Sequence, residues 1–180
     1  LLDCLRDGFG IGQAMVLMND PAGQRLYTVA SRGYAQSGVG AEIHPGDGVI
    51  GAAALARTPI RISHATSEFG YGRAARELAA SRGLVAGIVY EIPFPGMPES
   101  QSQIAVPMLA GGHLVGVLFA ESPATGKFGY DEEDALCVLA SVVANSADLY
   151  EAAPEMAEDQ PGAAPPQPVT PAGAPVRIRH

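Results

Sequence analysis

A strand–turn–strand–helix pattern in the second half of the chain constrains its fold more than any other feature. Two predicted strands, residues 104–109 and 114–121, lie on either side of Gly111 and Gly112 and are apolar apart from Glu121. Apolar runs of this length joined by a two-glycine turn are typical of a β-hairpin. Residues 131–134 are all acidic and open a helical pattern, and negative charge in a first turn stabilises a helix through its dipole. The pattern predicts a hairpin followed by a long helix, and it contains no recognisable catalytic group.

The other patterns predict more strands and helices around this hairpin. Further strands are expected at residues 13–19, 25–31 and 59–62, and helices over the first residues and at 46–56, 72–81 and 130–153. The segment from Asp20 to Gly23 has Pro at its second position and Gly at its fourth, which a type I turn prefers. Strands 13–19 and 25–31 should therefore form a second antiparallel hairpin. In the last helix, one apolar face is formed by Leu136, Leu139, Val143 and Tyr150.

Composition excludes several classes of protein. Hydrophobic residues make up 47% of the 180 residues, which is enough for a buried core. No apolar run approaches the length of roughly 18 residues that crosses a membrane. The net charge is −8, and the 11 Lys and Arg residues are scattered, so we expect no direct nucleic-acid contact and no membrane contact. The two cysteines lack metal-site or disulfide spacing and predict reduced thiols. No signal peptide is recognisable, and a cytoplasmic location is expected.

The chain divides into three parts by composition. Residues 1–153 carry all the strong strand and helix patterns and form the predicted domain. Residues 154–175 contain seven prolines and no aromatic residue, a composition typical of a disordered linker. Residues 176–180 alternate apolar and polar side chains, as the first strand of a further domain would. The absence of an initiator Met is consistent with a fragment of a longer protein.

The order of these elements resembles a GAF domain, the sensor module of many bacterial signalling and transcriptional regulators. Residues 48–62 look like the helix of that family that runs into its third strand, and residues 104–122 look like its paired central strands. Residues 128–140 look like the start of its closing helix. The resemblance implies an α+β fold, GAF-like and related to PAS domains. It has a central antiparallel sheet of five to six strands, with the terminal helices packed on one face. Ligand-pocket loops and short helices lie on the other face.

The sequence identifies no metal and no cofactor. No pair of its four histidines has helical metal-site spacing. His64 lies beside the loop that faces ligand in GAF domains. It is a candidate contact for a ligand or a haem, and the alternative is an ordinary loop histidine. The GAF domains that bind cyclic nucleotides carry an Asn before the residue that corresponds to Lys127, and this chain does not. Bilin attachment would need a cysteine in the pocket, and none is seen there.

The resemblance places the candidate ligand site between residues 62 and 94. Its candidate residues are Ile62, His64, Phe69, Tyr71, Arg73, Arg76, Tyr90 and Phe94. Arg73 and Arg76, three residues apart on a predicted helix, could hold an anionic ligand. Arg61 is a weaker candidate. The alternative is that the aromatic side chains complete the core and the arginines are solvated.

Three functions follow from the resemblance. The first is a regulatory domain that binds an unidentified small molecule over the sheet and passes the change through its terminal helices to an attached output domain. The second is a dimerisation or protein-interaction module without a ligand, in which the terminal helices form a homodimer. The third is a reductase of free methionine sulfoxide, which uses several pocket cysteines. Cys4 and Cys137 are expected in helices behind the sheet, so the chain is predicted not to be an enzyme.

Overall fold

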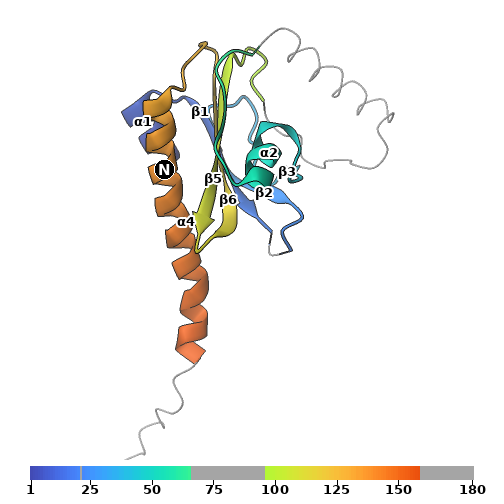
Figure 1. Cartoon of the computed structure of the whole chain (residues 1–180), viewed down its shortest axis with the longest axis vertical. Helices are drawn as coiled ribbons and strands as arrows, with labels where there is room; N and C mark the ends of the chain where they lie inside the picture. Colours follow the sequence, from blue (N-terminus) through green and yellow to red (C-terminus); the bar gives the residue numbers. More distant parts are fainter. Residues whose placement is uncertain (21, 66–95, 159–180) are drawn as a thin grey trace, which may run out of the picture.

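The computed structural model of the chain describes residues 1–20, 22–65 and 96–158, with side chains as far as Leu149 (Figure 1). Six antiparallel strands form one sheet in the order β3-β2-β1-β6-β5-β4. The strands are β1 (Gln13–Asn19), β2 (Leu26–Arg32), β3 (Glu42–Ile43), β4 (Ile60–Ile62), β5 (Ser102–Ala110) and β6 (His113–Ser122). The α+β sheet predicted from the sequence is confirmed, and β1 has the predicted bounds.

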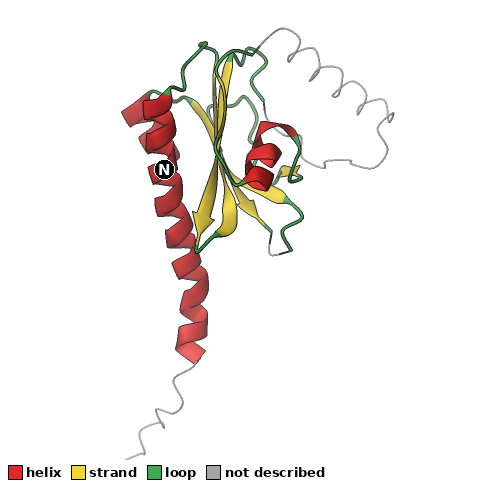
Figure 2. Cartoon of the chain, viewed as in Figure 1, coloured by secondary structure: helices red, strands yellow, loops and turns green. Residues whose placement is uncertain are grey.

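The helices cover the two faces of the sheet as expected. Helices α1 (Leu2–Phe9) and α4 (Tyr130–Glu158) lie together on one face, and α2 (Gly48–Ala56) lies on the other (Figure 2). The two terminal helices therefore pack against the same side of the sheet. Within the described residues, no helix is both long and apolar enough to span a bilayer.

The alternation of side chains along the strands gives each face its own core. Beneath α1 and α4 the buried residues include Leu5, Val16, Ile104, Val106, Leu118, Phe128, Leu136, Ala140 and Ala144. Beneath α2 they include Met15, Leu17, Leu26, Ile50, Ala53, Ala105, Val117 and Phe119. Successive residues of β6 thus enter opposite cores, as the two-residue period of a strand requires.

Several element ends differ from the sequence prediction. The α2 helix begins at Gly48 because Asp47, with φ −84° and ψ 122°, has extended backbone. The α4 helix runs to Glu158, beyond the predicted end at residue 153. In α1, Cys4 is exposed while Leu5 is fully buried, so the first helix has a narrower buried face than predicted. The predicted helix at residues 72–81 lies outside the described residues.

Candidate functional site

A row of side chains crosses one end of the sheet on the face that carries α2. Strand register aligns four residues of this row from β4 to β1, namely Ile62, Gln103, Glu121 and Gln13. The row two residues away consists of Ile60, Ala105, Phe119 and Met15, all of which belong to the core beneath α2. Because side chains two residues apart on a strand share a face, the first row also lies on the α2 face. We call these four residues the polar row, because three of them have polar side chains.

Glu121 is the centre of the polar row. Its side chain is only 1% exposed, and that of Gln103 only 7%. The Met97 backbone N–H donates to Glu121 Oε1 at 3.1 Å, and Gln103 Nε2 donates to Glu121 Oε2 at 3.3 Å. Gln103 Nε2 also lies 3.3 Å from the Ser100 hydroxyl. Among the described residues, the contacts of this buried carboxyl group are all neutral.

Burial dominates the electrostatics of this cluster. Loss of hydration raises the pKa of Glu121, although hydrogen bonds from Ser100 and from the Met97 backbone act in the opposite direction. Burial also raises the pKa of Tyr34, and the neighbouring charge of Glu121 raises it further. The buried Tyr34 hydroxyl interacts electrostatically with Glu121 but makes no well-formed hydrogen bond with a described residue. The cluster therefore places the Tyr34 hydroxyl beside a buried acid whose described contacts are all neutral.

A raised pKa at Glu121 predicts a specific pH dependence of stability. Above pH 4.5 the unfolded chain loses this proton before the folded one does, so the free energy of unfolding falls until the raised pKa is passed. Relative to a Glu121→Gln variant, the wild type should therefore lose stability over this window as the pH rises. Urea denaturation across a pH series measures the difference.

Glu132 provides a control of opposite sign. Its carboxylate accepts the Gly129 backbone N–H at 2.9 Å, which lowers its pKa. Relative to Glu132→Gln, the wild type should lose stability as the pH falls below 4.5 and through that lowered pKa. A difference between wild type and Glu121→Gln with the same sign as the Glu132 control would contradict the assignment of Glu121.

The polar row lies where the chain enters and leaves residues 66–95. The Ala65 N–H donates to the Gln101 carbonyl at 2.7 Å, next to Ser102 at the start of β5. On the far side of the segment, the Met97 N–H contacts Glu121, and Met97 is itself buried. Both described ends of residues 66–95 are therefore attached beside Glu121.

The predicted site residues are placed only in part. Ile62 is half-buried within the polar row, whereas His64 is exposed in the loop after β4. The remaining candidates, Phe69, Tyr71, Arg73, Arg76, Tyr90 and Phe94, lie outside the described residues. The prediction missed Gln103 and Glu121. A signal for them was present, because each is a polar residue at the outer end of an otherwise apolar strand.

Arg61 faces away from the polar row. It pairs with Ile104, whose side chain enters the core beneath α4. Its Nε lies 3.5 Å from Glu133 Oε2, and its guanidinium lies 4.4 Å from the centroid of the Tyr130 ring. Arg61 thus joins β4 to the first turn of α4, and the structure does not place it with a ligand on the α2 face.

Replacing Arg61 with methionine should lower the free energy of unfolding by about 1 kcal/mol, since the ion pair and the cation–π contact are both partly exposed and each is worth roughly 0.5–1 kcal/mol or less in such places. Urea denaturation measures the loss, with Arg25→Met as the control for another exposed ion pair, Arg25 with Glu42 at 2.8 Å. An Arg61→Met variant as stable as the wild type would show that this link carries no stability.

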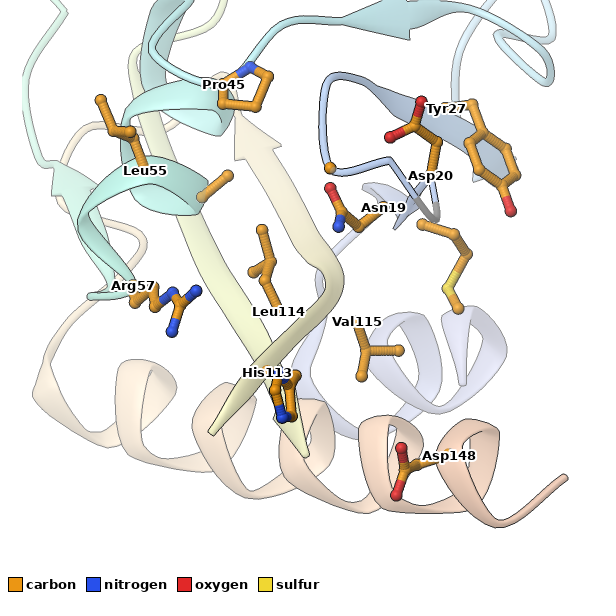
Figure 3. A pocket seen from close by; sticks show the side chains of 13 residues that line it. Asn19, Asp20, Tyr27, Pro45, Leu55, Arg57, His113, Leu114, Val115 and Asp148 are labelled. Carbon is orange, nitrogen blue, oxygen red and sulfur yellow. The ribbon is translucent and has the colours of Figure 1, made fainter. Parts of the chain in front are cut away.

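A concave site lies at the other end of the sheet from the polar row (Figure 3). This distal groove, of about 480 Å³, is lined by Met18, Asn19, Asp20, Gly23, Tyr27, Pro45, Ala54, Leu55, Arg57, His113, Leu114, Val115 and Asp148. Its charged side chains either hydrogen-bond to nearby backbone groups or are exposed. Arg57 Nη1 donates to the Gly112 carbonyl at 2.9 Å, and Asp20 Oδ1 accepts the Gln24 N–H at 2.8 Å. The groove contains none of the predicted site residues.

The two thiols of the chain lie on the other side of the sheet from Glu121. Cys4 is exposed on α1, and Cys137 is half-buried on α4. Burial raises the pKa of Cys137, and the charges of Glu133 and Asp134 raise it further, so its reactive thiolate form is disfavoured. In the described part of the chain, no cluster of His, Cys, Asp and Glu could hold a metal ion.

Comparison with known proteins agrees with this architecture. The GAF domain family model matches residues 1–147. The structure is similar to a GAF domain from an Acinetobacter phosphoenolpyruvate-protein phosphotransferase, with a TM-score of 0.59 and 18% identity. That match covers 85% of this chain and 80% of the other. No curated protein matches the chain.

Two further solved structures with this fold are enzymes. One is a type II free methionine-R-sulfoxide reductase from Thermoplasma acidophilum, with a TM-score of 0.56, 19% identity, and coverage of 79% of this chain and 83% of the other. The second, from Neisseria meningitidis, was solved in complex with its substrate, with a TM-score of 0.55, 20% identity, and coverage of 82% of this chain and 76% of the other. At these identities the likeness concerns the fold. With a family model that spans residues 1–147 and a six-stranded sheet between paired terminal helices and α2, the chain belongs to the GAF domain family.

Proposed function

We propose that this GAF domain is a regulatory sensor that binds a small molecule over the α2 face of its sheet, with the polar row as the polar anchor. The observation that supports this proposal most is the buried Glu121 carboxyl group. Small-molecule sites combine apolar walls with a few placed polar groups. Phe119 and Met15, two residues along their strands from Glu121 and Gln13, would provide the apolar floor of such a site.

The ligand chemistry that suits this anchor is a group rich in hydrogen-bond donors. A buried carboxylate with only neutral described partners is stabilised by a cation or by additional N–H or O–H donors. An amine, amidine or amide of the ligand would provide them. Residues 66–95, attached on both sides of Glu121, contain the other candidate contacts.

The same strands provide a route to the terminal helices. Glu121 lies on the α2 face of β6, and its neighbour Ala120 belongs to the core beneath α4. A ligand that shifts the ends of β5 and β6 would change the packing of α4, and α4 would pass the change to an attached output domain. A reductase function has less support, because neither Cys4 nor Cys137 lies on the α2 face.

A thermal-shift screen of amine- and amide-bearing metabolites tests the proposal. A ligand at about 100 times its dissociation constant adds about 2.7 kcal/mol of stability, which for a chain of this size raises Tm by several degrees. Glu121→Gln should abolish most of that shift. Asn19→Ala in the distal groove is the matched control and should retain it. The proposal would be contradicted if no compound stabilised the domain, or if Glu121→Gln left the ligand-induced shift in Tm unchanged.

A further inference from the structure

The distal groove lies where the pairing of the two central strands ends. Strands β1 and β6 are last paired at Met18 and Gly116. Beyond that pair, β1 stays paired with β2 as far as Asn19, and β6 stays paired with β5 as far as His113. Two hairpins therefore continue past the last pair that joins them, and the groove of about 480 Å³ lies at their ends (Figure 3). Small-molecule sites have volumes of roughly 300–1,000 Å³, so the groove is large enough to hold a ligand.

The lining of the distal groove joins the two helical layers of the molecule. Leu55 and Arg57 lie at the end of α2, and Asp148 lies on α4. Because these two helices cover opposite faces of the sheet, the groove passes around the end of the sheet from one face to the other (Figure 3). A molecule that fills the groove therefore contacts both layers.

Arg57 presents a positioned guanidinium at the α2 end of the groove. Its backbone has φ 52° and ψ 35°, and it is the only described residue other than glycine with a positive φ. Glycine is the usual residue at a helix end with this conformation, since a Cβ disfavours it. Arg57 Nη1 donates to the Gly112 carbonyl at 2.9 Å, which holds the side chain in place. Its remaining N–H groups are available to a carboxylate, which an arginine binds through two parallel hydrogen bonds.

Carboxylates provide the opposite charge elsewhere in the groove. Asp148 is exposed and forms no hydrogen bond or ion pair with a described residue. Asp20 Oδ1 accepts the Gln24 N–H at 2.8 Å, whereas its Oδ2 accepts no hydrogen bond from a described residue. Two carboxylates and one guanidinium repel a ligand that is only anionic and attract one that also carries an ammonium group.

Apolar side chains lie between the charged groups. Leu55 is 70% exposed and Tyr27 39% exposed, although both side chains are large and apolar. Leu114 and Val115 are half-buried and line the groove from β6. Covering these four side chains removes apolar surface from water, which favours binding of a ligand with an apolar body.

We propose that the distal groove binds a short apolar peptide with free termini, at a site separate from the polar row. The peptide carboxylate contacts Arg57, its side chains cover Leu55 and Leu114, and its ammonium group lies at Asp148 or Asp20. A single amino acid carries both charges on one carbon atom and cannot reach from the α2 side to the α4 side. An extended tripeptide spans about 10 Å and separates the two charges.

NMR titration of the whole chain with the tripeptide Ala-Leu-Ala tests this site. We expect the Asn19 Nδ2 and Gly112 N–H resonances to shift with one dissociation constant, while the Gln103 Nε2 resonances stay in place. Amidation of the peptide carboxylate should weaken binding to the wild type about tenfold, because a charge-assisted hydrogen bond is lost. Arg57→Gln has already lost this contact, so the free and amidated peptides should bind that variant equally.

The ammonium end is tested in the same way. Acetylation of the peptide amine should weaken binding to the wild type by a factor of several, and the effect should be smaller in Asp148→Asn. Asp131→Asn is the matched control, because Asp131 is exposed on the same helix but does not line the groove. This variant should discriminate among the free, amidated and acetylated peptides as the wild type does.

Three outcomes would overturn the inference. These are unchanged Asn19 and Gly112 resonances at about 10 mM peptide, where even a millimolar site is filled, wild-type binding that amidation does not weaken, and an amidation effect that survives in Arg57→Gln. Circular dichroism confirms the fold of each variant. Arg57→Gly, which suits the left-handed backbone and also removes the guanidinium, replaces Arg57→Gln if that variant unfolds. Because binding at the polar row is followed separately at Gln103, a failure here leaves the sensor proposal standing.

Discussion

Replacing Gly116 with alanine should lower the free energy of unfolding by about 2–3 kcal/mol, a typical cost of overpacking a core. Gly116 lies in β6, between β1 and β5. A Cβ at this position would overlap the Leu17 carbonyl oxygen and the Met108 methyl group. The methyl group can move, but the carbonyl belongs to the backbone of β1, so the two strands would have to separate.

Urea denaturation of Gly116→Ala measures this loss. Gly8→Ala in α1 is the matched control, because no atom outside the adjacent helix backbone lies within 4 Å of its added Cβ. Alanine is favoured over glycine in helices by about 0.5–1 kcal/mol, so the control should equal or exceed the wild type in stability. If Gly116→Ala unfolds at the wild-type urea concentration, the close approach of β1 and β6 is not as described.

Replacing Phe128 with alanine should cost about 3–5 kcal/mol, which is typical of large-to-small changes in a core. Phe128 is 1% exposed and lies among the residues that join α1, α4 and the sheet, with Leu5 and Leu136 in the same core. The neighbouring Lys127 donates from Nζ to the Phe9 carbonyl at 2.8 Å, so the segment before α4 is fastened to the end of α1. An emptied Phe128 site would loosen both terminal helices from the sheet.

Thermal and urea denaturation of Phe128→Ala test this expectation. Phe128→Leu, which keeps most of the buried volume, should cost about 1 kcal/mol. Tyr130→Ala, at a ring that is 77% exposed, should cost less than Phe128→Ala. A Phe128→Ala variant within about 0.5 kcal/mol of the wild type would mean that the helices are held elsewhere.

The fold was predictable because its longest elements carry their own periodicity. The β5–β6 hairpin and the acidic start of α4 could be recognised from residues close together in the sequence. Strand β3 was not predictable, because its two residues are too few to show a period. In the structure β5 begins at Ser102 rather than at residue 104. The prediction left out Ser102 and Gln103 because their polar side chains are typical of a loop.

The polar row could not be assembled from the sequence. It depends on the register that sets Gln103 opposite Glu121 and Gln13 on the other side of Glu121. Register is a tertiary property, and a shift of one residue would turn these side chains to the opposite face. Sequence reasoning did place Cys4 and Cys137 behind the sheet, because both belong to helices recognisable by their apolar faces. Its placement of His64 among the ligand contacts stays a prediction, and the structure leaves the His64 side chain exposed in the loop after β4.

The most direct test of ligand binding at the polar row is the NMR spectrum of side-chain amides during titration with a compound from the thermal-shift screen. Gln103 donates to Glu121 within the polar row, and Asn19 lines the distal groove at the other end of the sheet. If the proposal is correct, the Gln103 Nε2 resonances shift with the same dissociation constant as the thermal stabilisation, while the Asn19 Nδ2 resonances stay in place. Shifts at Asn19 with Gln103 unchanged would contradict it.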